Sequence, residues 1–341
     1  MKIVIDDNIP QLEERIRRAH PEIELVPLHR NRISADAVRN ADALIVRTHT
    51  KCNAALLEGS NVKLVGTATI GKNHIDTAWC EANGIKTVNA PGCNAPAVMQ
   101  YVACGLHAAG FDPSSDTLGV VGKGHIGSLV VDLYRKAGAK VIVCDPPRAE
   151  AGYTDEDYLL LDDLLAACDA VTFHVPLTFP AKEEKHPTLH LLNADRKSFP
   201  RIIVNASRGA VVDYRLFTSS VPESSTLVID TWPFEDDPEA KSIDPGRLVM
   251  IPLVATPHIA GYSLQGKQRA TRKMIEALND TFGLKIDADG LADYGFENLT
   301  PGLADVIASY DPSLDTDIFK SNPRKLESLR NDYQLRDEDK F

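Results

Sequence analysis

Three side chains suited to acid–base or anion-binding chemistry follow short apolar segments of this sequence. Arg208 comes after the segment IIVN, Glu235 comes five residues beyond TLVID, and His258 comes after LVAT. Each apolar segment has the composition of a buried β-strand. Arginine can bind a carboxylate through two parallel hydrogen bonds, histidine can exchange a proton, and a carboxylate beside that histidine holds its ring and stabilises its charged form. We therefore expect a site for a small carboxylic acid where the three strands end.

Each of these residues also has an ordinary structural interpretation. The arginine could form a surface ion pair, and a single histidine is more often structural than catalytic. Asp236, Asp237 and Glu239 stand close to Glu235, so the sequence leaves open which acid pairs with His258. The site is favoured because the carboxyl ends of parallel strands meet at one edge of a sheet, where ligands bind.

A glycine-rich turn upstream predicts a dinucleotide site. The segment LGVVGKGHIG places Gly122, Gly124 and Gly127 in the pattern G-x-G-x-x-G, after a β-type run and before a helical segment. The next expected strand ends at Asp145, eighteen residues beyond Gly127, where a carboxylate can accept hydrogen bonds from both ribose hydroxyls. Such an acid repels a 2′-phosphate, so we predict NAD rather than NADP, although Arg148 nearby leaves NADP open. The structural alternative is a plain turn from strand to helix.

Length and composition restrict the class of protein. A chain of 341 residues predicts two domains. The formal net charge of -11 opposes nucleic acid or an anionic membrane as a partner, and no apolar stretch reaches membrane-spanning length. The six cysteines occur singly and without metal-ligand spacing, so we expect reduced thiols, no metal site and a cytoplasmic protein.

Apolar β-type segments alternate with helical or polar segments as far as Gly261, which is typical of parallel α/β sheets. An apolar helix expected at 95–109 separates two such series. We predict an α/β fold with two doubly wound parallel-sheet domains, in which a Rossmann-type cofactor domain is inserted in a flavodoxin-like substrate domain. The expected boundaries are 1–95 for the first part of the substrate domain, 96–262 for the NAD-binding domain, and 263–341 for a return helix and a possible dimerisation tail.

Polar residues also follow two strands of the first series. They could bind a phosphate through charge and hydroxyl donors, and a phosphorylated four-carbon acid would suit such a lining. The alternative is a solvated loop. These residues are Arg47, Thr48, His49, Lys51, Lys72 and Asn73.

Together the segments GKGHIG, SRGAVVD, the acid after DTW and TPHIAGY resemble the D-isomer-specific 2-hydroxyacid dehydrogenase family, from Met1 to about Phe282. The resemblance implies an NAD-dependent oxidoreductase acting on a CH–OH group. It further implies that Arg208 binds the substrate carboxylate and polarises C2, that Glu235 orients the imidazole, and that His258 is the acid/base.

The resemblance also implies contact residues for both ligands. Thr48, Thr69 and Tyr262 match positions that contact substrate. The chain departs from the family where Phe234 and Asp236 replace the usual glycine and proline on either side of the acid. The expected cofactor contacts are Gly122, Gly124, His125, Ile126, Gly127, Asp145, Val175, Ala206, Arg208, Asp230 and Gly261.

Further segments, including RTHTK, VGTATIGKNHID, CDPPR and KLESLRNDYQLR, are similar to a branch of this family. That branch oxidises 4-phospho-D-erythronate to (R)-3-hydroxy-2-oxo-4-phosphooxybutanoate in pyridoxal phosphate (vitamin B6) biosynthesis. We therefore expect a small phosphorylated 2-hydroxy acid as substrate, NAD as cofactor, and the homodimer that the family suggests. The alternatives are a relative acting on 3-phosphoglycerate or on glyoxylate and hydroxypyruvate, or an NAD-sensing binding protein.

Overall fold

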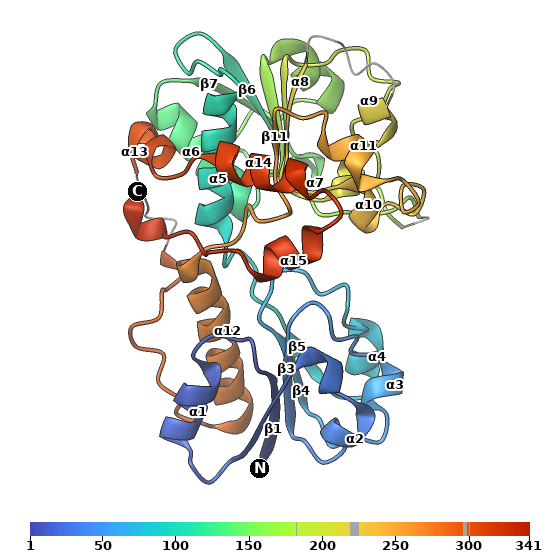
Figure 1. Ribbon diagram of the computed structural model, residues 1–341, viewed down its shortest axis with the longest axis vertical. Helices are drawn as coiled ribbons and strands as arrows, with labels where there is room; N and C mark the ends of the chain where they lie inside the picture. The colour runs from blue at the N-terminus through green and yellow to red at the C-terminus, as the bar shows by residue number, and fades with distance from the viewer. Residues whose placement is uncertain (182, 219–224, 296–298, 300) are drawn as a thin grey trace. The chain divides into compact units, whose positions relative to one another are not determined.

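Two separate parallel sheets organise the chain (Figure 1). The computed structural model describes residues 1–181, 183–218, 225–295, 299 and 301–341. The chain forms two units, one of Met1–Asn94 with Ser263–Glu297 and the other of Ala95–Tyr262 with Asn298–Phe341. The segment expected at 263–341 is thus divided, because its helical part belongs to the first unit and its tail to the second.

The first unit is built on five parallel strands in the order β2-β1-β3-β4-β5. This order is that of flavodoxin-like sheets. All neighbouring strands run parallel, and β1 lies between β2 and β3. The strands are β1 (Lys2–Asp6), β2 (Glu24–Leu28), β3 (Ala43–Val46), β4 (Leu64–Thr67) and β5 (Lys86–Val88).

Helices cover both faces of this sheet because successive strand residues point to opposite sides. Ile3 and Ile5 pack in one core with residues of α1 and α12. Val4 and Leu44 pack in a second core with residues of α2, α3 and α4. The helices are α1 (Leu12–Ala19), α2 (Ala35–Val38), α3 (Ala54–Leu57), α4 (Thr77–Ala82) and α12 (Leu264–Phe282), with a 3-10 turn, η1 (Arg30–Arg32).

The second unit is built on a six-stranded sheet, all parallel, in the order β11-β10-β9-β8-β6-β7. Strand β6 pairs with β7 on one side and with β8 on the other, so the order of the strands reverses at β6 and forms a topological switch point. Ligands bind at such a switch point, outside the carboxyl ends of the strands. The strands are β6 (Thr117–Val121), β7 (Lys140–Cys144), β8 (Ala170–Phe173), β9 (Ile202–Asn205), β10 (Thr226–Ile229) and β11 (Val254–Ala255).

A large apolar core holds this second sheet to its helices. Trp232 and Phe173 are fully buried in it, together with Phe319 from the tail. The apolar helix expected at 95–109 is present as α5 and is buried along most of its length. The helices are α5 (Ala95–Ala108), α6 (His125–Lys136), α7 (Pro146–Glu150), α8 (Leu161–Ala167), α9 (Arg215–Thr218), α10 (Pro233–Asp236), α11 (Pro245–Val249), α13 (Leu303–Ala308), α14 (Pro312–Ser321) and α15 (Leu326–Asn331), with 3-10 turns η2 (Gly209–Val211) and η4 (Glu338–Lys340).

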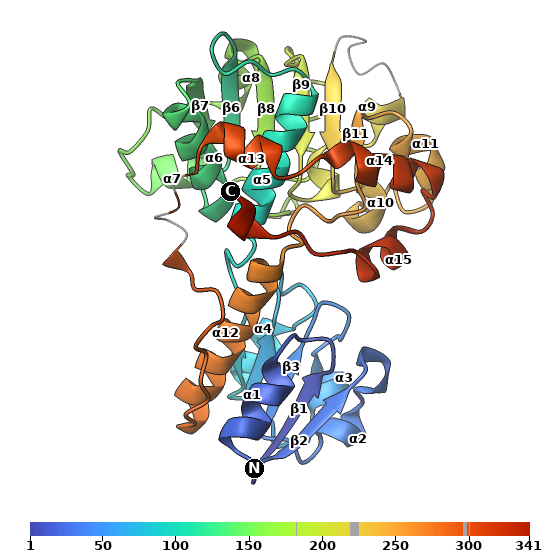
Figure 2. The same cartoon turned by 60° about the vertical axis from the view of Figure 1, so that its left-hand side comes forward.

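The carboxy-terminal tail packs on α5 and β11 as part of the second unit (Figure 2). The Ala255 N–H donates to Thr316 Oγ1 of α14 at 3.1 Å. Farther along, the buried Arg336 donates to the carbonyl oxygens of Ala97, at 3.2 Å, and Ala260. The tail therefore completes this unit, while its role in dimerisation stays a prediction.

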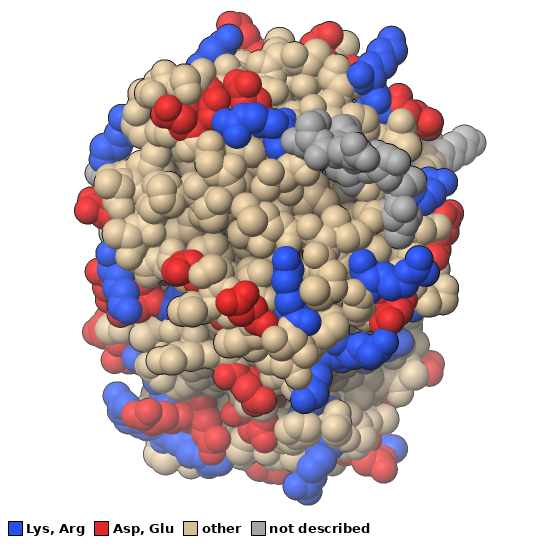
Figure 3. Space-filling model, turned by 45° about the horizontal axis from the view of Figure 1, so that its top comes forward, with Lys and Arg blue, Asp and Glu red and all other residues tan. Residues whose placement is uncertain are grey.

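The structure also describes the features on which the composition gave expectations, namely the state of the cysteines, the surface charge, membrane-spanning helices and clusters of metal-binding side chains. The six cysteines are free, and five of them are buried. On the face drawn in Figure 3, basic and acidic side chains alternate in small groups. Within the described ranges, no helix has the length and apolar character needed to cross a bilayer. The same residues contain no group of three or more His, Cys, Asp or Glu side chains that could hold a metal ion.

Candidate active site

The glycine turn joins β6 to α6 at the switch point of the second sheet. Gly122 has a φ of 90°, and a Cβ there would lie 2.7 Å from the His174 carbonyl oxygen. A Cβ at Gly127 would lie 1.9 Å from the Gly122 carbonyl oxygen, so no side chain fits at either position. At Gly124, the N-cap of α6, a Cβ would meet nothing within 4 Å. The turn is therefore tight on its inner side and open at the helix start, a form that admits a pyrophosphate.

Asp145 follows β7 beside this turn. Its Oδ2 accepts a hydrogen bond from the Lys123 N–H at 2.8 Å, and its Oδ1 accepts one from the Arg148 N–H at 3.1 Å. A carboxylate oxygen can accept more than one hydrogen bond. Asp145 is thus fixed in place and retains capacity for ribose hydroxyls.

Arg148 is the residue whose charge left NADP possible as the cofactor when only the sequence was considered. In the structure a neighbouring loop holds its side chain. Its Nε donates to the Tyr158 hydroxyl at 3.0 Å, and its Nη2 donates to Asp155 at 3.2 Å. The guanidinium also lies 3.9 Å from the centre of the Tyr153 ring. These contacts occupy the cation that could otherwise neutralise a 2′-phosphate.

Lys123, inside the glycine turn, is tied to the same loop. Its Nζ lies 2.8 Å from Asp155 and 2.5 Å from Glu156. Arg135 of α6 also pairs with Glu156, at 2.6 Å. Sequence reasoning did not single out this cluster, because no strand or helix pattern marks the loop that supplies the two acids.

The remaining expected cofactor residues also lie at the carboxyl side of the second sheet. His125 and Ile126 begin α6. Val175 follows β8, and its side chain borders the glycine turn. Ala206 and Gly261 follow β9 and β11. These positions agree with cofactor contact, which stays a prediction for each residue.

Arg208 lies between β9 and the turn η2. The Asn205 side chain donates to the Arg208 carbonyl oxygen at 2.9 Å, and Arg208 Nη1 donates to the Ser207 carbonyl oxygen at 2.7 Å. A Cβ on the next residue, Gly209, would lie 1.9 Å from the Trp232 carbonyl oxygen. Only glycine fits there, so the segment after Arg208 packs directly against the start of α10.

Glu235 on α10 and His258 after β11 form a hydrogen-bonded pair. His258 Nδ1 lies 2.8 Å from Glu235 Oε2. The other carboxylate oxygen, Oε1, accepts the Trp232 N–H at 2.9 Å. Because the carboxylate accepts the proton of Nδ1, the second ring nitrogen, Nε2, can exchange a proton with a ligand. Side-chain exposures of 30% for His258 and 17% for Glu235 leave the pair reachable but largely desolvated.

Opposing effects act on the Glu235 carboxyl group. Burial alone raises its pKa, but the charge and hydrogen bond of His258, the charge of Arg330 and the Trp232 N–H outweigh burial. The pKa of Glu235 is consequently lowered from its usual value, so the side chain is a carboxylate at neutral pH.

The other acids near α10 have different partners. Asp236 Oδ1 accepts the Ala210 N–H at 2.7 Å, and burial raises the pKa of Asp236 to about 6. Asp237 is buried and pairs with His190 Nε2 at 2.7 Å, while Glu239 is exposed. The structure thus identifies Glu235 as the acid that pairs with His258, a choice that the sequence left open.

Asp230 holds the loop that carries His258. Its Oδ1 accepts hydrogen bonds from the Ile259 N–H and the Thr256 hydroxyl, both at 2.7 Å, and its Oδ2 accepts the Ala260 N–H at 2.9 Å. His258 has a φ of 58°, which is costly for a residue other than glycine. These bonds offset that cost and fix the direction of the imidazole.

Tyr262, an expected substrate contact, lies beside the tail. Its ring is 6.1 Å from the Tyr333 ring, in an edge-on arrangement, and 5.9 Å from the guanidinium carbon of Arg330. Arg330 Nη1 also lies 3.7 Å from Glu235 Oε2. Sequence reasoning missed this arginine, although it lies in KLESLRNDYQLR, one of the segments that carried the resemblance.

In the first unit, the expected substrate residues lie in the loops after β3 and β4. Thr48 is exposed, and Thr69 Oγ1 lies 2.8 Å from Thr67 Oγ1. Thr67 Oγ1 is also 3.1 Å from His74 Nε2. Burial, with a smaller effect of the His49 charge, lowers the pKa of His74 to about 4, so its ring is neutral at pH 7.

Lys267 on α12 is a further cation of this unit that sequence reasoning did not single out. Burial lowers its pKa to about 8, and the charge of Arg47 contributes to the shift. Arg47 follows β3, so the two cations lie within electrostatic range of each other at the carboxyl side of the first sheet. A bound anion would stabilise both charges.

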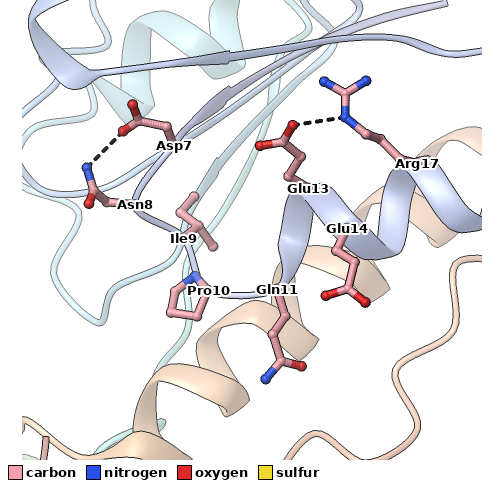
Figure 4. Close-up of a pocket in the computed structure, with 8 residues that line it drawn as sticks. All are labelled: Asp7, Asn8, Ile9, Pro10, Gln11, Glu13, Glu14 and Arg17. Atoms are coloured by element: carbon pink, nitrogen blue, oxygen red, sulfur yellow. Dashed lines mark hydrogen bonds and ion pairs between the residues drawn. The ribbon is translucent and has the colours of Figure 1, made fainter.

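A separate pocket of ≈ 540 Å³ lies at the turn from β1 to α1 (Figure 4). Its polar groups pair with one another, since Arg17 Nε donates to Glu13 at 2.9 Å and Asn8 donates to Asp7 at 2.8 Å. None of the expected substrate residues lines it, and its excess of carboxylates does not suit an anion. Its lining residues are Asp7, Asn8, Ile9, Pro10, Gln11, Glu13, Glu14 and Arg17.

Comparison with known proteins agrees with these observations. Residues 3–287 match the family model described as the D-isomer specific 2-hydroxyacid dehydrogenase, catalytic domain. The chain is 39% identical over 353 residues to erythronate-4-phosphate dehydrogenase of Bacteroides fragilis, covering 99% of this chain and 97% of that protein. It is 36% identical to the Porphyromonas gingivalis protein of the same name, covering 98% and 92% of the two chains.

Solved structures with lower sequence identity share the fold. D-lactate dehydrogenase from Aquifex aeolicus, complexed with NAD and lactic acid, is 22% identical with a TM-score of 0.63, covering 81% of this chain and 94% of that one. NAD+-bound 3-phosphoglycerate dehydrogenase of Entamoeba histolytica is also 22% identical with a TM-score of 0.63, covering 85% and 99%.

Proposed function

Because the chain belongs to the D-isomer specific 2-hydroxyacid dehydrogenase family, we propose that it oxidises C2 of 4-phospho-D-erythronate with NAD. The products are (R)-3-hydroxy-2-oxo-4-phosphooxybutanoate and NADH, in pyridoxal phosphate biosynthesis. The similarity to erythronate-4-phosphate dehydrogenases over nearly the whole chain supports this substrate. The observation that carries the chemistry is the Glu235–His258 pair, with Nδ1 and Oε2 2.8 Å apart.

The second unit has the features that a dinucleotide requires. The open helix start at Gly124 would take the pyrophosphate, and Asp145 would accept the ribose hydroxyls. Asp145 disfavours a 2′-phosphate, and Arg148 is already engaged by Tyr158 and Asp155. The residues therefore fit NAD better than NADP. Bound NAD supplies an acceptor for the hydride that leaves C2.

His258 acts as the base in the oxidation. Its Nε2 accepts the proton of the 2-hydroxyl group, and the electron pair of that O–H bond forms the carbonyl double bond. The C2–H bond breaks at the same time, and its electron pair leaves with the hydrogen as hydride. The ring then carries a positive charge, which the Glu235 carboxylate stabilises through Nδ1. In the reverse direction, the same nitrogen returns the proton to the carbonyl oxygen.

Arg208 binds the substrate carboxylate in this proposal. A guanidinium matches a carboxylate with two parallel hydrogen bonds and keeps its charge at any relevant pH. The close packing of Gly209 on Trp232 holds the Arg208 segment against the start of α10, the helix that carries Glu235. Such fixed placement lowers the cost of orienting C2.

Arg47 and Lys267 are the proposed ligands of the substrate phosphate. Both cations belong to the first unit, and burial, with a smaller effect of the Arg47 charge, lowers the pKa of Lys267 to about 8. A phosphate bound near both cations would stabilise their charged forms. Thr48 and Thr69 would add hydroxyl donors.

A cytoplasmic homodimer is the expected form of the enzyme, as the family resemblance suggests. Size-exclusion chromatography with light scattering measures the mass of the particle against the 37.2 kDa of one chain. A mass of one chain across the working concentration range contradicts the dimer.

The deciding assay is NADH formation with 4-phospho-D-erythronate, compared with 3-phosphoglycerate, glycerate and lactate. A parallel reaction contains a 2-oxo acid to reoxidise any NADH that stays bound after the first turnover, and there the 2-oxo product of each substrate is measured in place of NADH. We expect the highest kcat/KM with 4-phospho-D-erythronate. Equal or higher kcat/KM with another acid would contradict the substrate assignment and leave the dehydrogenase chemistry intact.

A further inference from the structure

The tail helix α15 brings a guanidinium to the Glu235–His258 pair. Arg330 Nη1 lies 3.7 Å from Glu235 Oε2, the same oxygen that is 2.8 Å from His258 Nδ1. Both Arg330 and Glu235 have side-chain exposures of 17%. An ion pair this far from water is screened less than a surface pair.

Packing of the tail fixes the position of this arginine. Leu326, at the start of α15, is buried in the core of the second unit, and Leu329 packs against the same core. That core includes Trp232, whose N–H is bound by Glu235 Oε1. One apolar cluster therefore anchors both the helix that carries Arg330 and the carboxylate that it faces.

The guanidinium has two further neighbours. Its Nη1 donates to Glu327 at 3.2 Å, one turn earlier on α15. Its central carbon lies 5.9 Å from the centre of the Tyr262 ring, a distance at which a cation and an aromatic ring attract. Nη1 thus lies between two carboxylates, the 57% exposed Glu327 at 3.2 Å and the largely buried Glu235 at 3.7 Å.

We propose that Arg330 is a positioning residue of the dehydrogenase, which holds the Glu235 carboxylate toward His258 and braces the Tyr262 ring. The inference rests on the proposed function and extends it to the carboxy-terminal tail. A contact of 3.7 Å exceeds a hydrogen bond, so Arg330 acts through its charge without taking the carboxylate from the histidine.

The charges around Glu235 determine the expected pH effect. Burial raises the pKa of this carboxyl, whereas His258 after β11 and Arg330 on α15 lower it. Asp236 on the same helix is a carboxyl with its pKa raised to about 6, so it adds negative charge only above that pH. Removing Arg330 therefore raises the pKa of Glu235, and the carboxylate that the histidine needs is lost at a higher pH.

The test compares steady-state kinetics of Arg330→Ala and Arg330→Lys with the wild type across the acid range. In Arg330→Ala we expect kcat to fall by about tenfold, KM for the hydroxy acid to change less than about twofold, and the acid-side decline of kcat to move up by about half a pH unit or more. Arg330→Lys, which keeps the charge, should recover most of kcat and the wild-type pH profile.

Arg324→Ala is the matched control. This tail arginine is exposed and pairs with Asp244 at 2.7 Å, so its removal should leave kcat and the pH profile unchanged. Melting temperature and the fluorescence of bound NADH show that each variant is folded and holds cofactor. If Arg330→Ala does not fold, Arg330→Gln takes its place, with the same expectations.

Three results would overturn the inference. One is wild-type kcat and pH profile in Arg330→Ala or Arg330→Gln. Another is a large rise in KM with kcat and the pH profile unchanged, which would make Arg330 a substrate-binding residue. A third is equal loss in the lysine and alanine variants. If the wild type prefers a different 2-hydroxy acid, only the substrate assignment fails, and the same comparison is made with that acid.

Discussion

Replacing Glu235 by glutamine removes the charge of the acid–base pair and leaves its shape. The amide oxygen can still accept the Trp232 N–H, now 2.9 Å from Oε1, so α10 should keep its start. What is lost is the attraction between the carboxylate and the imidazolium that forms when His258 takes the substrate proton. Two unit charges 2.8 Å apart attract by about 6 kcal/mol at an effective dielectric constant of about 20.

Part of this attraction is offset because water solvates the exposed part of the ring, although the amide NH2 of glutamine, a donor, then faces His258 Nδ1 in place of a carboxylate oxygen. Deleting one partner of a largely desolvated charged pair typically costs about 2 to 5 kcal/mol. We therefore expect Glu235→Gln to lose about 2 to 4 kcal/mol of transition-state stabilisation, or roughly 30- to 1,000-fold in kcat/KM.

The assay is steady-state NADH formation at neutral pH, with NAD affinity measured separately. Glu239→Gln is the control, because this acid is four residues away and exposed. NAD affinity should be unchanged in both variants. A loss below about threefold in Glu235→Gln, or an equal loss in Glu239→Gln, would refute the role of the pair.

Three further substitutions test other parts of the account. Arg208→Ala should lose about 2 to 5 kcal/mol in kcat/KM, and kinetics near wild type with the carboxylate substrate would make Arg208 purely structural. Asp145→Ala should relax the preference for NAD over NADP in kcat/KM, and an unchanged preference would place the selector elsewhere. Burial raises the pKa of Asp236 to about 6, so its stabilising protonated form is lost as the pH rises through that value. Asp236→Asn, which can still accept the Ala210 N–H, should therefore raise the melting temperature relative to wild type at about pH 8 and much less at about pH 4.5, and an equal difference at both would contradict this.

The sequence was informative where a strand ends in a residue with distinctive chemistry. Alternating and apolar patterns mark the strands, and strand ends of a parallel sheet share one edge, so Arg208 and His258 could be assigned to one side of the second sheet. The glycine turn was equally clear, because its spacing reflects a backbone requirement that the structure shows at Gly122 and Gly127.

Contacts between distant irregular segments could not be read from such patterns. Glu235 pairs with His258 only because the short helix α10 directs its side chain differently from those of Asp236 and Asp237. Arg330 reaches the same carboxylate from a helix almost a hundred residues farther along the chain. Both outcomes depend on packing, which neither periodicity nor composition encodes.

The unit to which the tail belongs could not be read from the sequence for the same reason. The region after the long helix α12 has weak periodicity, so the sequence predicted only a return helix followed by a possible dimerisation tail over 263–341. In the structure, buried contacts from Thr316 and Arg336 bind this region to the second unit. A few long-range contacts thus decide which unit a polar segment completes.

Transfer of the hydrogen on C2 tests the central claim most directly. The measurement uses 4-phospho-D-erythronate carrying deuterium at C2, NAD and the wild-type enzyme, with the reduced cofactor isolated and its mass determined. Direct hydride transfer predicts that the NADH formed carries the deuterium. NADH without deuterium, or 2-oxo acid formed with the deuterium released to water, would contradict the proposed reaction.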